Sequence, residues 1–393
     1  MDNNATTKVA EEVFEEMKPY LTDLYGNPSS MHTFGGQVGR KVDEARDRVA
    51  NVLGAEYSTE IIFTSCGTES NSTAIFSALQ AYPDRKEIIT TRVEHPAILS
   101  LAPYLERQGI AVVELKVDSK GMLDLNEYSH FLNENTALVS IMMANNETGV
   151  IFPVEEMARM ARERGVLFHT DAVQAVGKIP INMKDSAIDM LSLSGHKLHA
   201  PKGVGALYVR RGTKFRPFLR GGHQEKNRRA GTENVASIIA LGKAVELAAG
   251  RLTEENTVVR EIRDRLENGI LERVPRAIVN GDRENRLPNT TNISFEYVEG
   301  EGILLLLNEL NIAASSGSAC TSGSLEPSHV LRAMGVPFTA AHGSIRFSLS
   351  CYNTMEEADY VIENLPLIIE RLRAISPYWK DGQPIMEFEP TYG

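Results

Sequence analysis

The chain has 393 residues, of which 42% are hydrophobic and 24% charged. It is too long for a single hydrophobic core, so we expect two domains. Its net charge of -11 argues against nucleic-acid binding, because an acidic surface repels phosphate backbones. The longest purely apolar run, Ile303 to Leu307, is far shorter than a membrane span, and no signal peptide follows Met1. We expect a cytoplasmic protein that does not bind membranes.

Short apolar runs alternate with amphipathic stretches between about residues 60 and 210. The runs predict strands at 61–64, 87–91, 112–115, 138–142, 166–169, 190–193 and 205–209. Stretches with helical periodicity lie between several of these runs, for example at 154–164. Continuous apolar strands separated by helices favour a mostly parallel sheet covered on both faces, which is an α/β domain.

A different pattern follows the predicted helix at 234–250. It consists of a helix at 254–274, a strand at 292–297, a helix at 302–310, a Gly/Ser-rich loop, a strand at 344–350 and a helix at 355–375. This order predicts a smaller α+β domain. We therefore predict a large α/β domain over 11–250, and a small domain formed by 1–10 and 251–393 that carries the loop at about 315–326.

Polar side chains follow most of the predicted strands of the large domain. Ligands in open α/β sheets bind beyond the carboxyl ends of the strands, so these residues are candidates for a site. They are Gly67 and Thr68 after the first strand, His95 after the second, Asn146 after the fourth, Asp171 and Gln174 after the fifth, and Ser194, His196 and Lys197 after the sixth.

The residue types at these strand ends suit pyridoxal phosphate (PLP). The Gly67-Thr68 turn opens a helix whose N–H groups can hold a phosphate, although small polar residues there can also simply cap the helix. A desolvated Lys197 can form a Schiff base, and Asp171 can keep a pyridine nitrogen protonated. The structural alternatives are a surface lysine and a helix cap, but the combination predicts a PLP site.

Three cysteines, at 66, 320 and 351, differ in their surroundings. Their odd number and wide spacing argue against a disulfide framework and against a permanent metal site. Cys66 and Cys351 adjoin apolar strands, so we expect them to pack. Cys320 lies in SSGSACTSGS at 315–324, and small polar neighbours favour an exposed, mobile and reactive thiol.

The chain resembles the cysteine desulfurases of the class V aminotransferase family, which are fold type I PLP enzymes. The motifs that carry the resemblance over nearly the whole length include DNNATT at 2–7, FTSCGTES at 63–70, VEHPA at 93–97, HTDAVQAVGK at 169–178, LSGHKLHAPKG at 193–203, RRAGTEN at 228–234, SSGSACTSGSLEPSHVLRAMG at 315–335 and AHGSIRFSLS at 341–350. The forms GHKLHAPKG and GGHQE most resemble the nitrogen-fixation branch. Family members usually carry a few residues before DNNATT, where this chain begins.

The resemblance implies that the protein removes sulfur from L-cysteine, releases L-alanine and carries the sulfur as a persulfide on Cys320. It implies catalytic roles for Cys320, Lys197 and His95. Lys197 would form the Schiff base, and His95 would stack on the PLP ring and handle protons. The resemblance further assigns Asp171 to the pyridine nitrogen, Gln174 and Asn146 to the phenolic oxygen, and Gly67, Thr68, Ser194 and His196 to the phosphate. Thr232 would reach that phosphate from the other subunit of a homodimer, and Arg346, with Asn146, would bind the substrate carboxylate.

The implied sulfur acceptor is an iron–sulfur scaffold protein, in the assembly of nitrogenase metalloclusters, where Cys320 can become a transient cluster ligand. Two alternatives stay open. A selenocysteine lyase or another class V aminotransferase would use the same scaffold, and formation of alanine plus sulfide from cysteine, without a keto acid, separates a desulfurase from these. A non-enzymatic iron–sulfur carrier would use the cysteines as ligands, and a yellow, metal-free protein would argue against it.

Overall fold

The computed structural model describes residues 1–316, 327–380 and 382–385. Its larger sheet has seven strands: β1 (Ile61–Thr64), β2 (Glu87–Thr91), β3 (Ala111–Leu115), β4 (Thr136–Ser140), β5 (Leu167–Asp171), β6 (Met190–Ser194) and β7 (Gly205–Val209). They lie in the order β1-β7-β6-β5-β4-β2-β3, and of these seven β7 runs opposite to the others. The predicted mostly parallel sheet is confirmed.

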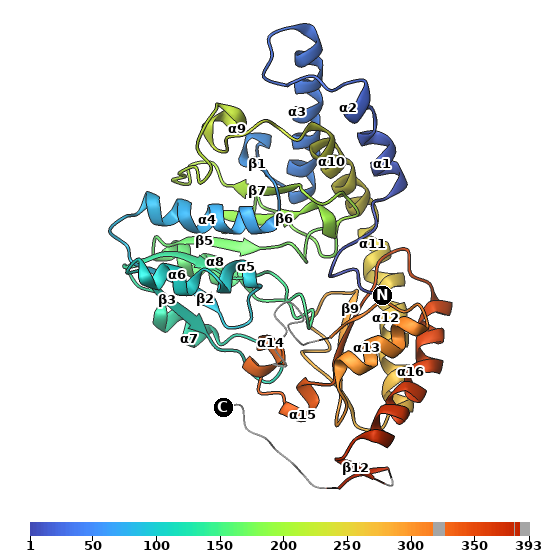
Figure 1. Ribbon diagram of the computed structural model, residues 1–393. Helices are drawn as coiled ribbons and strands as arrows, with labels where there is room; N and C mark the ends of the chain where they lie inside the picture. Colours follow the sequence, from blue (N-terminus) through green and yellow to red (C-terminus); the bar gives the residue numbers. More distant parts are fainter. Residues whose placement is uncertain (317–326, 381, 386–393) are drawn as a thin grey trace.

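Helices cover both faces of this sheet (Figure 1). Successive residues of a strand point to opposite faces, so Ile61 and Phe63 enter one core while Ile62 enters the other. The core around Ile62 also takes in α4 (Gly67–Ala81), α5 (Pro96–Leu99) and α6 (Ala102–Arg107). The opposite core takes in α3 (Thr33–Leu53), α7 (Leu125–Phe131), α8 (Val154–Glu163) and α10 (Val235–Gly250).

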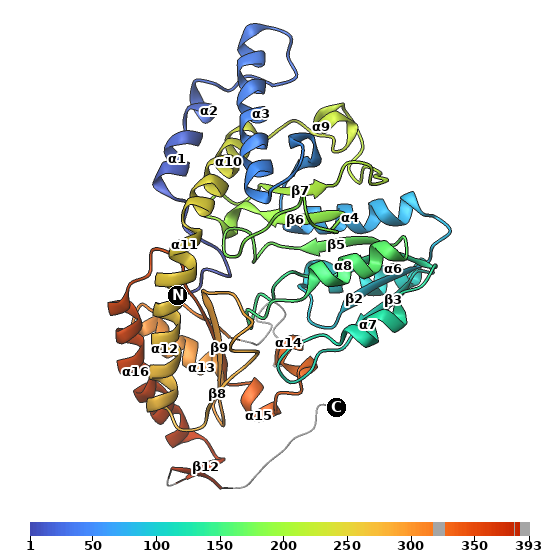
Figure 2. The same ribbon diagram turned by 180° about the vertical axis from the view of Figure 1, so that it is seen from behind.

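A second sheet is built from β8 (Ala277–Val279), β9 (Thr290–Phe295), β10 (Ser315–Ser316) and β11 (Ser344–Ser348). Its order is β10-β11-β9-β8, and all its pairings are antiparallel. The helices α12 (Arg260–Arg273), α13 (Gly300–Glu309) and α16 (Met355–Ile375) contribute to its own apolar core, as Figure 2 shows from behind. The division of the chain into the two domains predicted above stays a prediction.

Two predicted elements of this part differ in detail. The long helix expected at 254–274 is interrupted, because α11 (Leu252–Glu254) continues through a π-helical turn, η3 (Glu255–Val259), into α12. The loop expected from residue 315 begins as a strand, since Ser315 and Ser316 pair with Arg346 and Ile345. The predicted final helix, 355–375, has the bounds of α16.

The remaining elements are short. They are α1 (Glu11–Met17), α2 (Pro19–Thr22), η1 (Ser58–Glu60), η2 (Gly195–Lys197), α9 (Gln224–Asn227), α14 (His329–Ala333), α15 (Phe338–Ala341), β12 (Trp379–Lys380) and β13 (Gln383–Pro384). Within the described ranges, every helix is too short or too polar to span a lipid bilayer.

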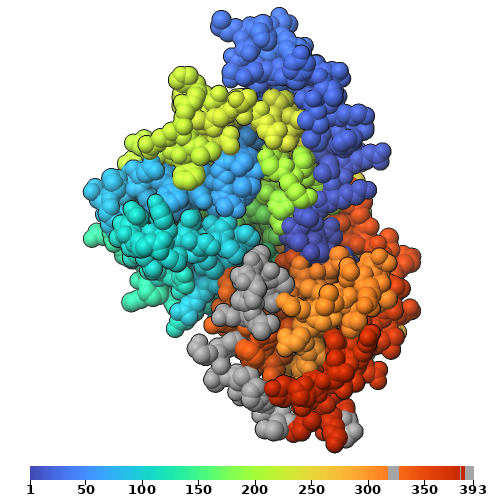
Figure 3. Space-filling view, viewed as in Figure 1, coloured from blue at the N-terminus to red at the C-terminus, as the bar shows by residue number. Residues whose placement is uncertain are grey.

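The first ten residues lie between the two sheets. The backbone of Asp2 bridges Ser348 on β11, whereas the Thr7 N–H donates to the His196 carbonyl in η2, after β6. Figure 3 shows these residues, in dark blue, at the surface between the orange part and the upper part of the molecule. The N-terminal segment therefore connects the second sheet to the edge of the first.

Candidate active site

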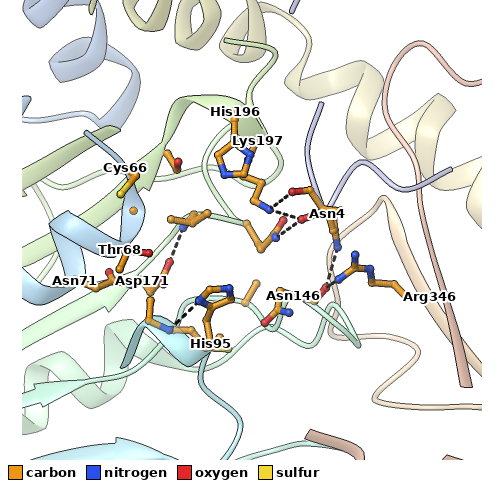
Figure 4. Close-up of a pocket in the computed structure, with 18 residues that line it drawn as sticks. Asn4, Cys66, Thr68, Asn71, His95, Asn146, Asp171, His196, Lys197 and Arg346 are labelled. Atoms are coloured by element: carbon orange, nitrogen blue, oxygen red, sulfur yellow. Dashed lines mark hydrogen bonds between the residues drawn. The ribbon is translucent and has the colours of Figure 1, made fainter. Parts of the chain in front are cut away.

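The carboxyl ends of five parallel strands meet at a cavity of about 390 Å³ (Figure 4). Ten of the predicted site residues line it: Gly67, Thr68, His95, Asn146, Asp171, Gln174, Ser194, His196, Lys197 and Arg346. Residues far apart in the sequence meet there because β1, β2, β4, β5 and β6 all end at the same edge of the sheet.

Lys197 reaches the cavity from η2, the short turn that follows β6. Its ammonium group donates to the backbone carbonyl of Asn4 and, at 2.8 Å, to that of Ala5. Burial lowers the pKa of Lys197 to about 8, and the positive charge of Arg346 contributes. A lysine with such a pKa provides a neutral amine near physiological pH, as a nucleophile or a proton acceptor requires.

Asp171 ends β5 and is 7% exposed. Its Oδ2 accepts a 2.6 Å hydrogen bond from the side-chain amide of Asn71, and its Oδ1 accepts from the Val173 N–H at 2.9 Å. Two donors fix the orientation of the carboxylate. Asp171 can therefore present a fixed negative charge to a cationic group in the cavity.

The start of α4 and the end of β6 form an anion cradle. Cys66 precedes α4 and makes no side-chain cap, so the first N–H groups of the helix remain available beside Thr68. A Cβ atom at position 67 would lie 2.9 Å from Cγ2 of Val173, so Gly67 avoids a contact that would force the Val173 side chain to move. The Ser194 hydroxyl is buried without a hydrogen-bond partner in the described chain. These donors suit a phosphate group.

Two imidazoles flank the cavity. His95 caps α5 and accepts a hydrogen bond from the Ala97 N–H on Nδ1. Its ring faces the cavity, and the surrounding protein lowers its pKa by desolvation. Burial lowers the pKa of His196 to about 4, helped by the charge of Lys197. Both rings are therefore neutral near pH 7 and can act as hydrogen-bond donors.

Arg346 enters from β11 of the second sheet and is 8% exposed. Its Nη1 donates to the backbone carbonyl of Asn146 at 3.0 Å, and its Nη2 donates to Asp2 and Ser315. Its Nε is buried and has no hydrogen-bond partner in the described chain. Gln174 similarly donates to the Asn4 carbonyl while its Oε1 stays unpartnered. Such unsatisfied polar atoms indicate a ligand.

Two predicted residues lie outside this arrangement. Cys320 falls outside the described residues. Thr232 is exposed and is absent from the residues of the described chain that line the cavity. Of the other cysteines, Cys351 packs against the second core and accepts a 3.1 Å hydrogen bond from Arg251. Cys66, which the sequence favours as a packing residue, lies on the cavity wall.

Sequence reasoning missed several residues that shape the site. Asn4 is 2% exposed and accepts hydrogen bonds from both Lys197 and Gln174 through its carbonyl. Asn71 lies one helical turn after Gly67, a spacing that places both on one face of α4 and that could have identified it. Glu94 is fully buried, and burial raises its pKa to about 8.

The fold and the cavity define an α/β protein with a lysine, a fixed carboxylate and an anion cradle at the carboxyl edge of its sheet. The chain belongs to the aminotransferase class-V family, whose model matches residues 1–361. It is an enzyme of that family.

Relatives of the chain share its full length. The cysteine desulfurase NifS of Azotobacter vinelandii is 62% identical over 397 residues, covering 100% of this chain and 99% of its own. A solved structure of a NifS-like protein is 40% identical, with a TM-score of 0.89, covering 94% of this chain and 99% of that one. SspA, solved in complex with cysteine, is 35% identical, with a TM-score of 0.79 and coverages of 90% and 99%.

Proposed function

We propose that this protein is a PLP-dependent cysteine desulfurase, which converts L-cysteine to L-alanine and retains the sulfur as a persulfide on Cys320. The observation that supports this function most is the convergence of Lys197, Asp171 and Arg346 on one cavity. A lysine, a carboxylate and a guanidinium there suit an amino-acid substrate and a PLP cofactor. The relative from Azotobacter vinelandii bears the corresponding name.

The residues present fit PLP. The unpartnered Ser194 hydroxyl, Thr68 and the start of α4 would hold its phosphate, and Asp171 would pair with its pyridine nitrogen. Lys197 would bind it covalently, because its amine loses a proton near pH 8. Gln174 would face the phenolic oxygen. When bound, PLP supplies an electron sink for the Cα carbanion of the substrate.

The chain's own groups would orient the substrate and move its protons. Arg346 would bind the α-carboxylate in the cavity that Lys197 also lines. The Lys197 amine would accept the Cα proton. His95 lies on the opposite wall, where a neutral ring can donate and accept protons. The buried Met142 and Ala144 line the cavity, and the Met142 N–H donates to the buried Glu94 side chain behind that wall.

The sulfur step requires a thiolate that receives the substrate sulfur. The Cys320 thiolate forms an S–S bond with that sulfur while the substrate C–S bond breaks. The bonding electrons stay on the carbon skeleton, which takes up a proton and leaves as L-alanine. One cysteine and one enzyme thiol thus give one alanine and one persulfide, without an external oxidant.

A homodimer would complete the phosphate site through Thr232. In the single chain Thr232 is exposed, while Arg229 of the same segment forms an ion pair with Glu69 in the first turn of α4, at 2.8 Å. Large apolar side chains are also exposed near the start of α3, among them Tyr25 at 73% and Met31 at 103%. Both features suit burial against a second copy.

The sulfur acceptor would be an iron–sulfur scaffold protein in the cytoplasm, within the assembly of nitrogenase metalloclusters. This part of the proposal rests on the motifs shared with the nitrogen-fixation branch. If the proposal is right, mixing the persulfide-loaded enzyme with a scaffold protein transfers the sulfur to that protein. Retention of all the sulfur on the enzyme would contradict it.

The function is tested by the visible spectrum of the purified protein before and after L-cysteine is added, with alanine and sulfide quantified. We expect absorption bands of PLP that change on addition, and equal amounts of alanine and released or enzyme-bound sulfur. Formation of a keto acid would instead indicate an aminotransferase, and turnover of selenocysteine alone would indicate a selenocysteine lyase.

A further inference from the structure

Arg346 is already paired with a carboxylate of its own chain. Its Nη2 lies 2.9 Å from Oδ1 of Asp2 and 3.0 Å from Oγ of Ser315, and Ser315 in turn donates to the same Asp2 oxygen at 2.8 Å. All three meet along one edge of the second sheet, since Asp2 bridges Ser348 and Ser315 pairs with Arg346. A carboxylate, a hydroxyl and a guanidinium therefore form a closed triangle beside the cavity.

This arrangement blocks the usual way in which arginine holds a carboxylate. A guanidinium makes two parallel hydrogen bonds to a carboxylate through Nε with Nη2, or through Nη1 with Nη2. Both modes need a hydrogen of Nη2, and Nη2 already donates to Asp2 and Ser315. The Nε of Arg346 is free, but it offers a single bond. A bidentate substrate must displace one of the two residues.

We propose that Asp2 competes with the substrate carboxylate for Arg346 and so sets the affinity of the enzyme for its amino acid. This inference rests on the proposed function in one respect, that the ligand of Arg346 is an α-carboxylate. The substrate carboxylate accepts the two hydrogen bonds that Arg346 and Ser315 otherwise donate to Asp2. It replaces Asp2 in the triangle, so that Nη2 of Arg346 and the Ser315 hydroxyl each keep an acceptor.

The displaced Asp2 carboxylate can turn into open space beside the second sheet. The Asp2 side chain is 23% exposed, whereas that of Arg346 is 9% exposed. Asp2 lines a second, open cavity of about 920 Å³, whose wall carries Lys8 and Arg251 together with Glu11 and Glu12. A side-chain rotation into this open, solvated space would reduce the repulsion between Asp2 and the bound substrate, because water screens the charge of Asp2 there.

The test is the affinity of the complete holoenzyme for L-alanine, which carries the carboxylate but no sulfur. In Asp2→Asn the side chain keeps its shape and loses its charge. We expect the dissociation constant for L-alanine, followed by the cofactor absorbance, to fall about three- to tenfold. The KM for L-cysteine should fall similarly without a matching rise in kcat. Binding of L-alaninamide, which lacks the carboxylate, should not change.

Two further variants control for charge and folding. Asp2→Glu keeps the charge and should bind L-alanine like the unmodified protein. Glu163→Gln makes the same charge change at the exposed end of α8, outside the cavity that Asp2 lines, and should also leave the affinity unchanged. If Asp2→Asn binds L-alanine equally or more weakly, Asp2 merely supports Arg346 and the inference is wrong. If no variant desulfurates cysteine while Asp2→Asn still tightens L-alanine binding, the proposed function fails and the competition stands.

Discussion

The side-chain amide of Asn71 lies 2.6 Å from Oδ2 of Asp171, so that a residue of α4 holds the carboxylate at the end of β5. Asn71 is 1% exposed, and its own Oδ1 has no hydrogen-bond partner in the described chain. The Asn71 side chain therefore makes its hydrogen bond to the Asp171 carboxylate. Asn71, which also lines the cavity, acts as a positioning residue for Asp171.

Removal of this amide should weaken PLP binding. Asn71→Ala deprives Asp171 of a charge-assisted hydrogen bond, worth about 1.5–3 kcal/mol, so we expect a PLP affinity about ten- to a hundredfold lower. Titration of the apoprotein with PLP measures it. Ser72→Ala, half-buried on the same helix, is the matched control and should bind normally. Equal affinities of the two variants would show that Asp171 needs no such support.

Covalent attachment of the cofactor should depend on Lys197. Borohydride reduction of the unmodified holoprotein should link PLP to the peptide that contains Lys197, and Lys197→Ala should abolish that link although PLP can still bind through its phosphate. Lys202→Ala alters an exposed lysine nearby and should keep the link. Mass spectrometry of the digested protein identifies the site, and reduction onto another lysine would refute the assignment.

Substitution of Arg346 should change both the substrate affinity and the basicity of Lys197. Loss of a charge-assisted pair in Arg346→Ala should raise the KM for L-cysteine about ten- to a hundredfold. In the unmodified apoprotein, the rate of covalent PLP uptake should rise with pH through about 8, because the neutral amine is the nucleophile. The Arg346 charge lowers the pKa of Lys197, so the midpoint in Arg346→Ala should lie at higher pH. An unshifted midpoint would contradict this coupling.

Glu94 should make the protein less stable as the pH rises. Burial raises its pKa to about 8 in the folded state, above the value of 4.5 expected in an unfolded chain. The folded state then holds a proton that the unfolded state releases, so the contribution of Glu94 is present below pH 4.5 and is lost as the pH approaches 8. Glu94→Gln lacks this titration. Relative to the unmodified protein, it should gain about 2–4 kcal/mol between pH 4.5 and 8.

Melting midpoints of the two proteins across this pH range check the prediction for Glu94. The amide keeps an acceptor for the Met142 N–H, so the packing should survive the substitution. A pH-independent difference between the two melting midpoints would show that the carboxylate is charged in the folded state.

Cys320 should be the thiol that receives sulfur. Cys320→Ala should keep PLP and respond spectrally to L-cysteine, yet yield neither sulfide nor alanine. Cys66→Ala and Cys351→Ala should stay active, with some loss of stability where packing is lost. Limiting iodoacetamide should label Cys320 first and abolish desulfuration in proportion. Preferential labelling of Cys66 or Cys351, or full activity after Cys320 is alkylated, would rule out the persulfide step.

Local patterns in the sequence were enough to predict the architecture and most of the candidate site. Buried strands such as β1 and β7 consist of continuous apolar runs, and α16 combines helical periodicity with a capping box at Thr354. Once a parallel sheet is expected, its strand ends must share one edge. Asp171, Ser194 and Lys197 could therefore be placed together without a known structure.

The tertiary structure alone decided the features that depend on long-range contacts. No local pattern tells that β7 reverses its direction, or that the Asn4 carbonyl meets Lys197 across 193 positions of the chain. The same holds for the pairing of Asp2 with Arg346, since the N-terminal segment is placed by bridges to β11 and hydrogen bonds to η2. Periodicity reports which side of an element is buried, whereas the partner of a buried polar group is chosen by how the elements pack.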